Sequence, residues 1–132
     1  KDELMVWVSI PVPENGWGFS FEKVARRRCQ DIASVNSGLG LRMAGERIAA
    51  AHLSAGGVAP VPLYLKAASA FLAGREVTPA LVRELALLAD GEIAPISDVR
   101  GSAAYKRALL RRLLAAHFLE LFPKRFAAGD LP

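Results

Sequence analysis

The chain has 132 residues, of which 52% are hydrophobic and 23% are charged, so a disordered chain is excluded and one folded domain with its own core is expected. The formal net charge of +4 is a mild excess that bears on surface association and not on fold. No apolar run approaches the ~20 residues of a transmembrane helix, so no membrane span is expected.

The first part of the sequence has the period-two alternation of β-strands. Residues 4–10 carry apolar side chains at alternate positions and precede two prolines, which predicts a first strand. After a turn at residues 14–16, alternating aromatic residues predict a second strand from Trp17 to Lys23 or Val24.

Two further strands are predicted around glycine residues. Residues 36–43 carry Gly38 and Gly40 within a strand pattern, where glycine marks a bulge or a close backbone approach. A turn then leads into a fourth strand over 47–55, although its alanines equally suit a helix. Neither these glycines nor the Gly56-Gly57 pair has the sequence context of a nucleotide-binding loop, so we interpret all of them as turn or bulge glycines.

From residue 63 onward the periodicity is helical. A short alanine-rich helix is predicted over 65–72, and a second begins at Pro79 behind a threonine cap and ends at residues 90–91. The third and longest helix is predicted from about Ser102 to about Phe122. Its leucines form the buried side, and four basic residues are expected mostly outside that side: Lys106, Arg107, Arg111 and Arg112.

A run of strands followed by a run of helices predicts an α+β fold. We expect an antiparallel sheet of three to four strands, followed by three helices packed on one face, in a single domain over 1–132. We also interpret the chain as part of a longer protein.

The histidines and the cysteine do not predict a metal site. His52 and His117 have no ligand residues at metal-binding spacing, so surface or groove histidines are expected. Cys29 is the only cysteine, which excludes an intrachain disulfide and agrees with a reducing compartment such as the cytoplasm. We expect Cys29 to serve packing, with the neighbouring Arg28 as a weak indication of reactivity.

Three consecutive arginines, Arg26 to Arg28, form the densest basic run. They are solvated surface in one interpretation, a nucleic-acid contact in another, and the lining of a site for an anionic cofactor or acidic partner in a third. The residues themselves do not rank a nucleic-acid contact above a site for an anionic cofactor or acidic partner.

Three stretches resemble motifs of one family. Residues 23–33, KVARRRCQDIA, resemble K-x-x-x-R-x-x-x-D-I-A; residues 55–62, AGGVAPVP, resemble the turn GGVAPxP; and residues 94–106, APISDVRGSAAYK, resemble P-I-S-D-x-R-x-S-x-x-Y-R. In this order they resemble the C-terminal subdomain of the FAD-binding subunit of molybdenum hydroxylases, such as xanthine dehydrogenase and carbon monoxide dehydrogenase. The resemblance covers about residues 4–122, and the last motif is more similar to the xanthine dehydrogenase branch.

The resemblance implies a role inside a larger oxidoreductase. Most of the FAD site then belongs to an upstream FAD-binding domain that is absent from this chain. Electrons from a molybdopterin subunit pass through 2Fe-2S clusters, held in an iron–sulfur domain or subunit, to FAD and then to NAD. The isolated domain is expected to be inactive, with no nucleic acid or membrane as partner.

The resemblance also implies roles for individual residues. Lys23 matches a position beside the flavin ring, and the loop from Arg27 to Gln30 matches the region near the flavin face where NAD approaches. Gln30 stands where relatives often carry an acid, so the local field there is expected to differ. Four further motif positions are expected to support the architecture: Asp31, Asp98, Arg100 and Tyr105.

A non-enzymatic interaction module is the alternative. It would bind an acidic partner or RNA through Arg26 to Arg28 and the arginine side of the last helix. The substrate of a complete enzyme stays open in either case, because it is chosen at a molybdenum centre that this chain does not contain.

Overall fold

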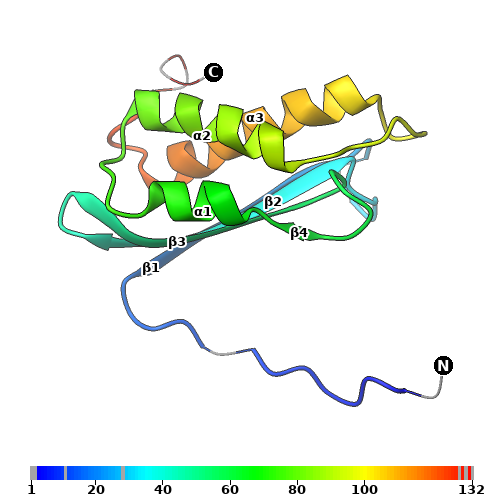
Figure 1. Ribbon diagram of the computed structural model, residues 1–132, viewed down its shortest axis with the longest axis horizontal. Helices are drawn as coiled ribbons and strands as arrows, with labels where there is room; N and C mark the ends of the chain where they lie inside the picture. The colour runs from blue at the N-terminus through cyan, green and yellow to red at the C-terminus, as the bar shows by residue number, and fades with distance from the viewer. Residues whose placement is uncertain (1–2, 11, 28, 128, 130, 132) are drawn as a thin grey trace.

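The computed structural model describes residues 3–10, 12–27, 29–127, 129 and 131, and consists of one sheet with helices on one of its faces (Figure 1). The strands run antiparallel in the spatial order β1-β2-β3-β4. The elements are β1 (Trp17–Val24), β2 (Val35–Ala44), β3 (Arg47–Gly56), β4 (Leu63–Tyr64), α1 (Lys66–Leu72), α2 (Pro79–Glu92) and α3 (Ala103–Leu121). The predicted α+β class is confirmed.

The core lies between the sheet and the helices. Strands β2 and β3 alternate as half-buried strands do, with Leu39 and Leu53 fully buried opposite each other in the register. Helices α1 and α3 pack on the sheet, and α2 packs on both of them. The leucine spacing of α3 accounts for this, because it places Leu110, Leu114 and Phe118 on one buried side.

Three helix ends are held by side chains. Thr78 and Ser102 accept hydrogen bonds from the first turns of α2 and α3, as their positions predict. The start of α1 is capped by a side chain from the end of α2. The Glu92 carboxylate accepts hydrogen bonds from the backbone N–H groups of Ala67 and Ala68 at 3.0 and 2.7 Å. No described helix combines the length and apolar character needed to cross a bilayer.

Two predictions about strands are wrong. Residues 4–10 are exposed and have no regular secondary structure, and the structure pairs them with no described strand. Alternation reports only a preference, and a strand also needs a neighbour for its backbone N–H and C=O groups. Conversely, β4 lies where a helical pattern was expected, and it pairs with Ser54 and Ala55 of β3.

Candidate functional site

The three family-like motifs meet at one end of the sheet. They form the connection 25–34 between β1 and β2, the connection 57–62 between β3 and β4, and the segment 93–102 that precedes α3 (Figure 1). Hydrogen bonds join them: Ser34 Oγ donates to the Arg100 carbonyl at 3.0 Å, and the Ala94 N–H donates to the Val58 carbonyl at 3.0 Å. Segments far apart in sequence therefore build one local structure.

Gly57 allows two of these segments to come into contact. Its φ is +79°, in the left-handed region, and a Cβ at this position would lie 2.3 Å from the Ser34 carbonyl oxygen. Only glycine combines that backbone conformation with so close an approach. The interpretation as a turn glycine is therefore confirmed for Gly57, whereas Gly56 is the last residue of β3 and pairs with Asn36.

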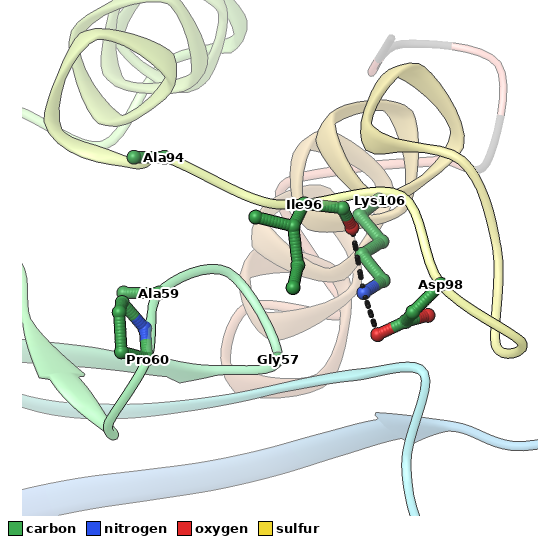
Figure 2. A pocket seen from close by; sticks show the side chains of 7 residues that line it. All are labelled: Gly57, Ala59, Pro60, Ala94, Ile96, Asp98 and Lys106. Carbon is green, nitrogen blue, oxygen red and sulfur yellow. Dashed lines mark hydrogen bonds and ion pairs between the residues drawn. The ribbon is translucent and has the colours of Figure 1, made fainter.

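Lys106 joins the segment 93–102 to α3. Figure 2 shows its side chain pointing from the helix between Ile96 and Asp98, on one side of a cavity of about 260 Å³ whose other side carries Ala59 and Pro60. The ammonium donates to the Ile96 carbonyl at 3.0 Å and to the Asp98 carboxylate at 2.6 Å. Lys106 is only 3% exposed, so the prediction that it lies mostly outside the buried side is wrong.

Asp98 is an ionised acceptor in this arrangement. The hydrogen bond from Lys106 is the main cause that holds the pKa of its carboxyl below the ordinary value, and the Arg100 N–H, which donates at 2.9 Å, adds to it. The carboxylate thus ties the loop to the helix through Lys106, and the Arg100 N–H fixes its position within the loop.

Asp31 holds the connection 25–34 in shape. Its carboxylate accepts from the Arg27 N–H at 2.9 Å and lies 3.7 Å from the Arg100 guanidinium, which also donates to the Ile32 carbonyl at 2.8 Å. The Arg27 N–H is the first cause, and the Arg27 charge a further one, that lowers the pKa of Asp31. Arg26 donates to the Val99 carbonyl and so adds a further link between the segments 25–34 and 93–102.

Lys23, Arg27 and Gln30 lie on this loop or at its edge, and all three are exposed. The Lys23 ammonium donates to the Asp31 carbonyl at 3.2 Å, and the Arg27 guanidinium donates to the Gln30 carbonyl at 3.1 Å. Gln30 has a φ of +49°, an uncommon conformation for a residue other than glycine. The loop therefore presents two cations to the surface while its backbone is hydrogen-bonded.

The remaining predicted residues are placed as follows. Tyr105 lies at the start of α3 with its ring against Gly101, where an added Cβ would be 2.5 Å from a ring carbon. Cys29 is exposed, so the expectation that it serves packing is wrong. Arg28 lies outside the described residues. Among the described residues, no group of three or more His, Cys, Asp or Glu side chains is placed to hold a metal ion.

A buried polar cluster between β1 and α3 escaped the sequence analysis. His117 is fully buried, with its Nδ1 atom 2.7 Å from the Ser20 hydroxyl, which in turn donates to Glu120. Burial lowers the pKa of His117 to about 4, and burial together with the neighbouring Glu120 raises the pKa of Glu22. The expectation of a surface or groove histidine is wrong for His117.

That expectation is confirmed for His52. Its ring is exposed on β3, stacks on Trp17 with the ring centroids 5.3 Å apart, and is hydrogen-bonded to the Tyr64 hydroxyl at 2.8 Å. The chain therefore has one buried and one exposed histidine, which can be compared directly.

The buried histidine predicts an acid-dependent loss of stability. His117 stays neutral in the folded protein down to a pKa of about 4, whereas the unfolded chain binds the proton near the ordinary value of 6.5. The stabilisation is complete above pH 6.5 and is lost as the pH falls toward 4, about 2 kcal/mol of it by pH 5. Urea unfolding at pH 7.5 and pH 5 measures this.

Two variants separate His117 from other acid effects. In His117→Gln the pH dependence over this range should flatten, and in His52→Gln it should match the parent protein, because His52 is exposed. An unchanged slope in His117→Gln would contradict the assignment.

Comparisons with known proteins match this chain to flavoprotein components. A family model described as "CO dehydrogenase flavoprotein C-terminal domain" matches residues 20–121. The carbon monoxide dehydrogenase medium chain of Afipia carboxidovorans is 33% identical over 79% of this chain and 36% of its own length. The xanthine dehydrogenase/oxidase of Gallus gallus is 32% identical over 92% of this chain and 9% of its own length.

A solved structure agrees in fold. The carbon monoxide dehydrogenase of Hydrogenophaga pseudoflava, in a form described as lacking the Mo-pyranopterin moiety of the molybdenum cofactor, superposes with a TM-score of 0.77 at 29% identity. The match covers 81% of this chain and 37% of that one. The chain thus spans well under half the length of the relatives it matches.

Proposed function

Because this chain belongs to the CO dehydrogenase flavoprotein C-terminal domain family, which is found in the FAD subunits of molybdenum hydroxylases, we propose that it completes the flavin pocket of a xanthine dehydrogenase-like enzyme. In this proposal electrons pass from iron–sulfur clusters through FAD to NAD. The observation that supports it best is the hydrogen-bonded loop 25–34, which carries the exposed Arg27 and contacts the exposed Lys23 near the end of β1.

The donors on this loop suit a flavin that gains negative charge on reduction. Lys23 is exposed and makes one hydrogen bond, to the Asp31 carbonyl, among the residues the structure describes, so its ammonium has further donors to offer. When bound, FAD supplies the redox chemistry. Lys23 would hold positive charge beside the pyrimidine edge of the ring and favour the reduced form electrostatically.

The approach of NAD depends on the same loop in this proposal. Arg27 carries a guanidinium at the surface, and guanidinium groups bind phosphates well. Gln30 adds no charge where an acid would repel a dinucleotide phosphate. In this proposal Asp31 and Arg100 act indirectly. Their side chains form hydrogen bonds that fix the backbone of the loop, and they take no part in the reaction.

The proposed partners are the other parts of the enzyme. They comprise an upstream FAD-binding domain, an iron–sulfur domain or subunit and a molybdopterin subunit, and the isolated chain is inactive. The free, exposed thiol of Cys29 supports a cytoplasmic location, where thiols stay reduced.

Lys23→Ala in the intact subunit tests the role of this cation. We expect the flavin to remain bound, its reduction potential to become more negative, and flavin reduction or NAD turnover to slow by about tenfold, the effect of ~1.4 kcal/mol. Stopped-flow kinetics and a redox titration measure this. Lys66→Ala, at an exposed lysine at the start of α1, is the control and should change neither. Unchanged kinetics and potential in Lys23→Ala would remove it from the site.

The alternative of an interaction module for RNA or an acidic partner has weaker support. Arg107 and Arg111 of α3 both pair with Asp90, at 3.3 and 3.0 Å, and Arg26 is bonded to Val99. These three arginines therefore have partners within the chain. They do not form a continuous row of unpaired charges that an acidic partner or RNA would bind.

A further inference from the structure

The face of the sheet turned away from the helices is apolar at β1. Side chains alternate along a strand, and in β1 the buried Ser20 and the half-buried Glu22 face α3, whereas Phe19 and Phe21 point the other way. Phe19 is 69% exposed. The strand thus turns its polar side to the core and its aromatic side outward, the reverse of an ordinary half-buried strand.

This outward face contains a trough of about 500 Å³. Its floor includes Gly38 and Gly40, and Trp17, Phe19, His52 and Tyr64 line it. A Cβ on Gly38 would lie 3.8 Å from the rings of both Phe19 and Phe21, so those rings lie against the glycine backbone. The aromatic surface is therefore ordered by its own contacts, and exposed apolar surfaces of this kind mark places of contact.

The chain itself indicates what lies over the trough. Pro13 is part of the lining. The segment 4–10 ends three residues before Pro13, and its apolar side chains are all exposed. Figure 1 shows this segment on the side of the sheet opposite the helices. Three extended residues span at most ~10 Å, so a structure that takes up residues 4–10 is held close to the trough.

The position of Lys23 points to the same side. It follows Trp17, Phe19 and Phe21 at the odd positions of β1, so strand alternation places it on the outward face, in line with the aromatic residues. If Lys23 lies beside the flavin, the polypeptide that binds the flavin must approach this face.

We propose that the outward face of the sheet, with Trp17, Phe19 and Phe21 at its centre, is the docking surface for the preceding flavin-binding part of the same subunit. Residues 4–10 add a strand to that part, which satisfies their backbone groups and covers their apolar side chains. The proposal rests on the proposed function, because the flavin-binding part is its occupant. The aromatic contact fixes the distance between Lys23 and the flavin.

Oxidative footprinting of the intact subunit tests this proposal. Hydroxyl radicals oxidise exposed side chains, and mass spectrometry measures the rate at each residue in the folded and the urea-unfolded subunit. Leu87, on the outer side of α2, is the matched control, because it is 70% exposed against 69% for Phe19. We expect folding to abolish most of the oxidation at Trp17, Phe19 and Phe21 and to leave Leu87 reactive.

The same sample distinguishes this proposal from the proposed function. Flavin absorbance with freely oxidised Phe19 would overturn the docking proposal and leave the proposed function standing. Protected Phe19 in a subunit that takes up no FAD would support docking and overturn the flavin role. Protection that disappears when a dimeric subunit is diluted to monomers would assign the face to a second copy and overturn the proposal.

A pair of variants provides a second measurement. Phe19→Asp in the intact subunit should restore oxidation at Trp17 and loosen flavin retention, because docking would bury an unpaired carboxylate. Leu87→Asp should leave both unchanged. Since Phe19 lies outside the core, this domain should keep its fold in either variant. Continued protection of Trp17 in Phe19→Asp would overturn the proposal.

Discussion

Gly57→Ala is expected to destabilise the domain by about 3–5 kcal/mol. The new methyl group would lie 2.3 Å from the Ser34 carbonyl oxygen, a backbone atom that can move only if the connections 25–34 and 57–62 separate. The φ of Gly57 is +79°, in the left-handed region, so a residue with a Cβ would also be strained in its backbone. Urea or thermal unfolding measures the loss, and flavin uptake by the intact subunit should weaken with it.

Gly74→Ala is the matched control for this substitution. Gly74 has almost the same φ, +77°, but a Cβ there meets nothing within 4 Å. It should therefore cost only the backbone strain, about 1 kcal/mol. Equal losses in the two variants would show that the close approach to Ser34 contributes nothing.

Lys106→Met is expected to cost about 1–3 kcal/mol, because the buried ammonium is lost whereas the Asp98 carboxylate stays accessible to water. Methionine replaces the buried hydrocarbon stem, but the Ile96 carbonyl and the Asp98 carboxylate lose the ammonium that donates to both. The pKa of Asp98 should rise toward its ordinary value, since Lys106 is the main cause of its lowering. Chemical unfolding and NMR titration of Asp98 measure the two effects.

Lys66→Met provides the comparison at an exposed lysine. Its cost should be small, because surface lysines contribute little to stability. A double-mutant cycle with Asp98→Ala isolates the contact, and the two substitutions should be strongly non-additive. If Lys106→Met is as stable as Lys66→Met, the buried lysine does not hold the loop to α3.

Most of the fold was predictable because β2, β3 and α2 are amphipathic. Strand β2 alternates buried and partly exposed side chains around Leu39 and Leu41, and α3 repeats leucines at helical spacing. Thr78 and Ser102 mark helix starts by their chemistry. These signals are local, so neighbouring residues in the sequence are sufficient to predict each of these elements.

The errors occur where a distant partner decides. The two-residue strand β4 is too short to have a period, and it exists only because β3 offers an edge to pair with. Residues 4–10 have the period but no described partner. Lys106 and His117 look like surface residues in sequence, yet Asp98 and Ser20, brought close by the fold, make their burial possible.

The candidate site divides in the same way. The motif resemblance indicated Lys23, Arg27 and Gln30, and the structure places Lys23 near the end of β1 and the other two on the loop that follows it. The contact of Gly57 with Ser34 could be suspected only from the glycine pair, because nothing in the sequence states which segment comes close.

The visible absorption spectrum of the purified intact subunit tests the central claim most directly. We expect flavin bands at close to one FAD per subunit. A folded, colourless subunit that takes up no added FAD would contradict the claim that this domain completes a flavin pocket.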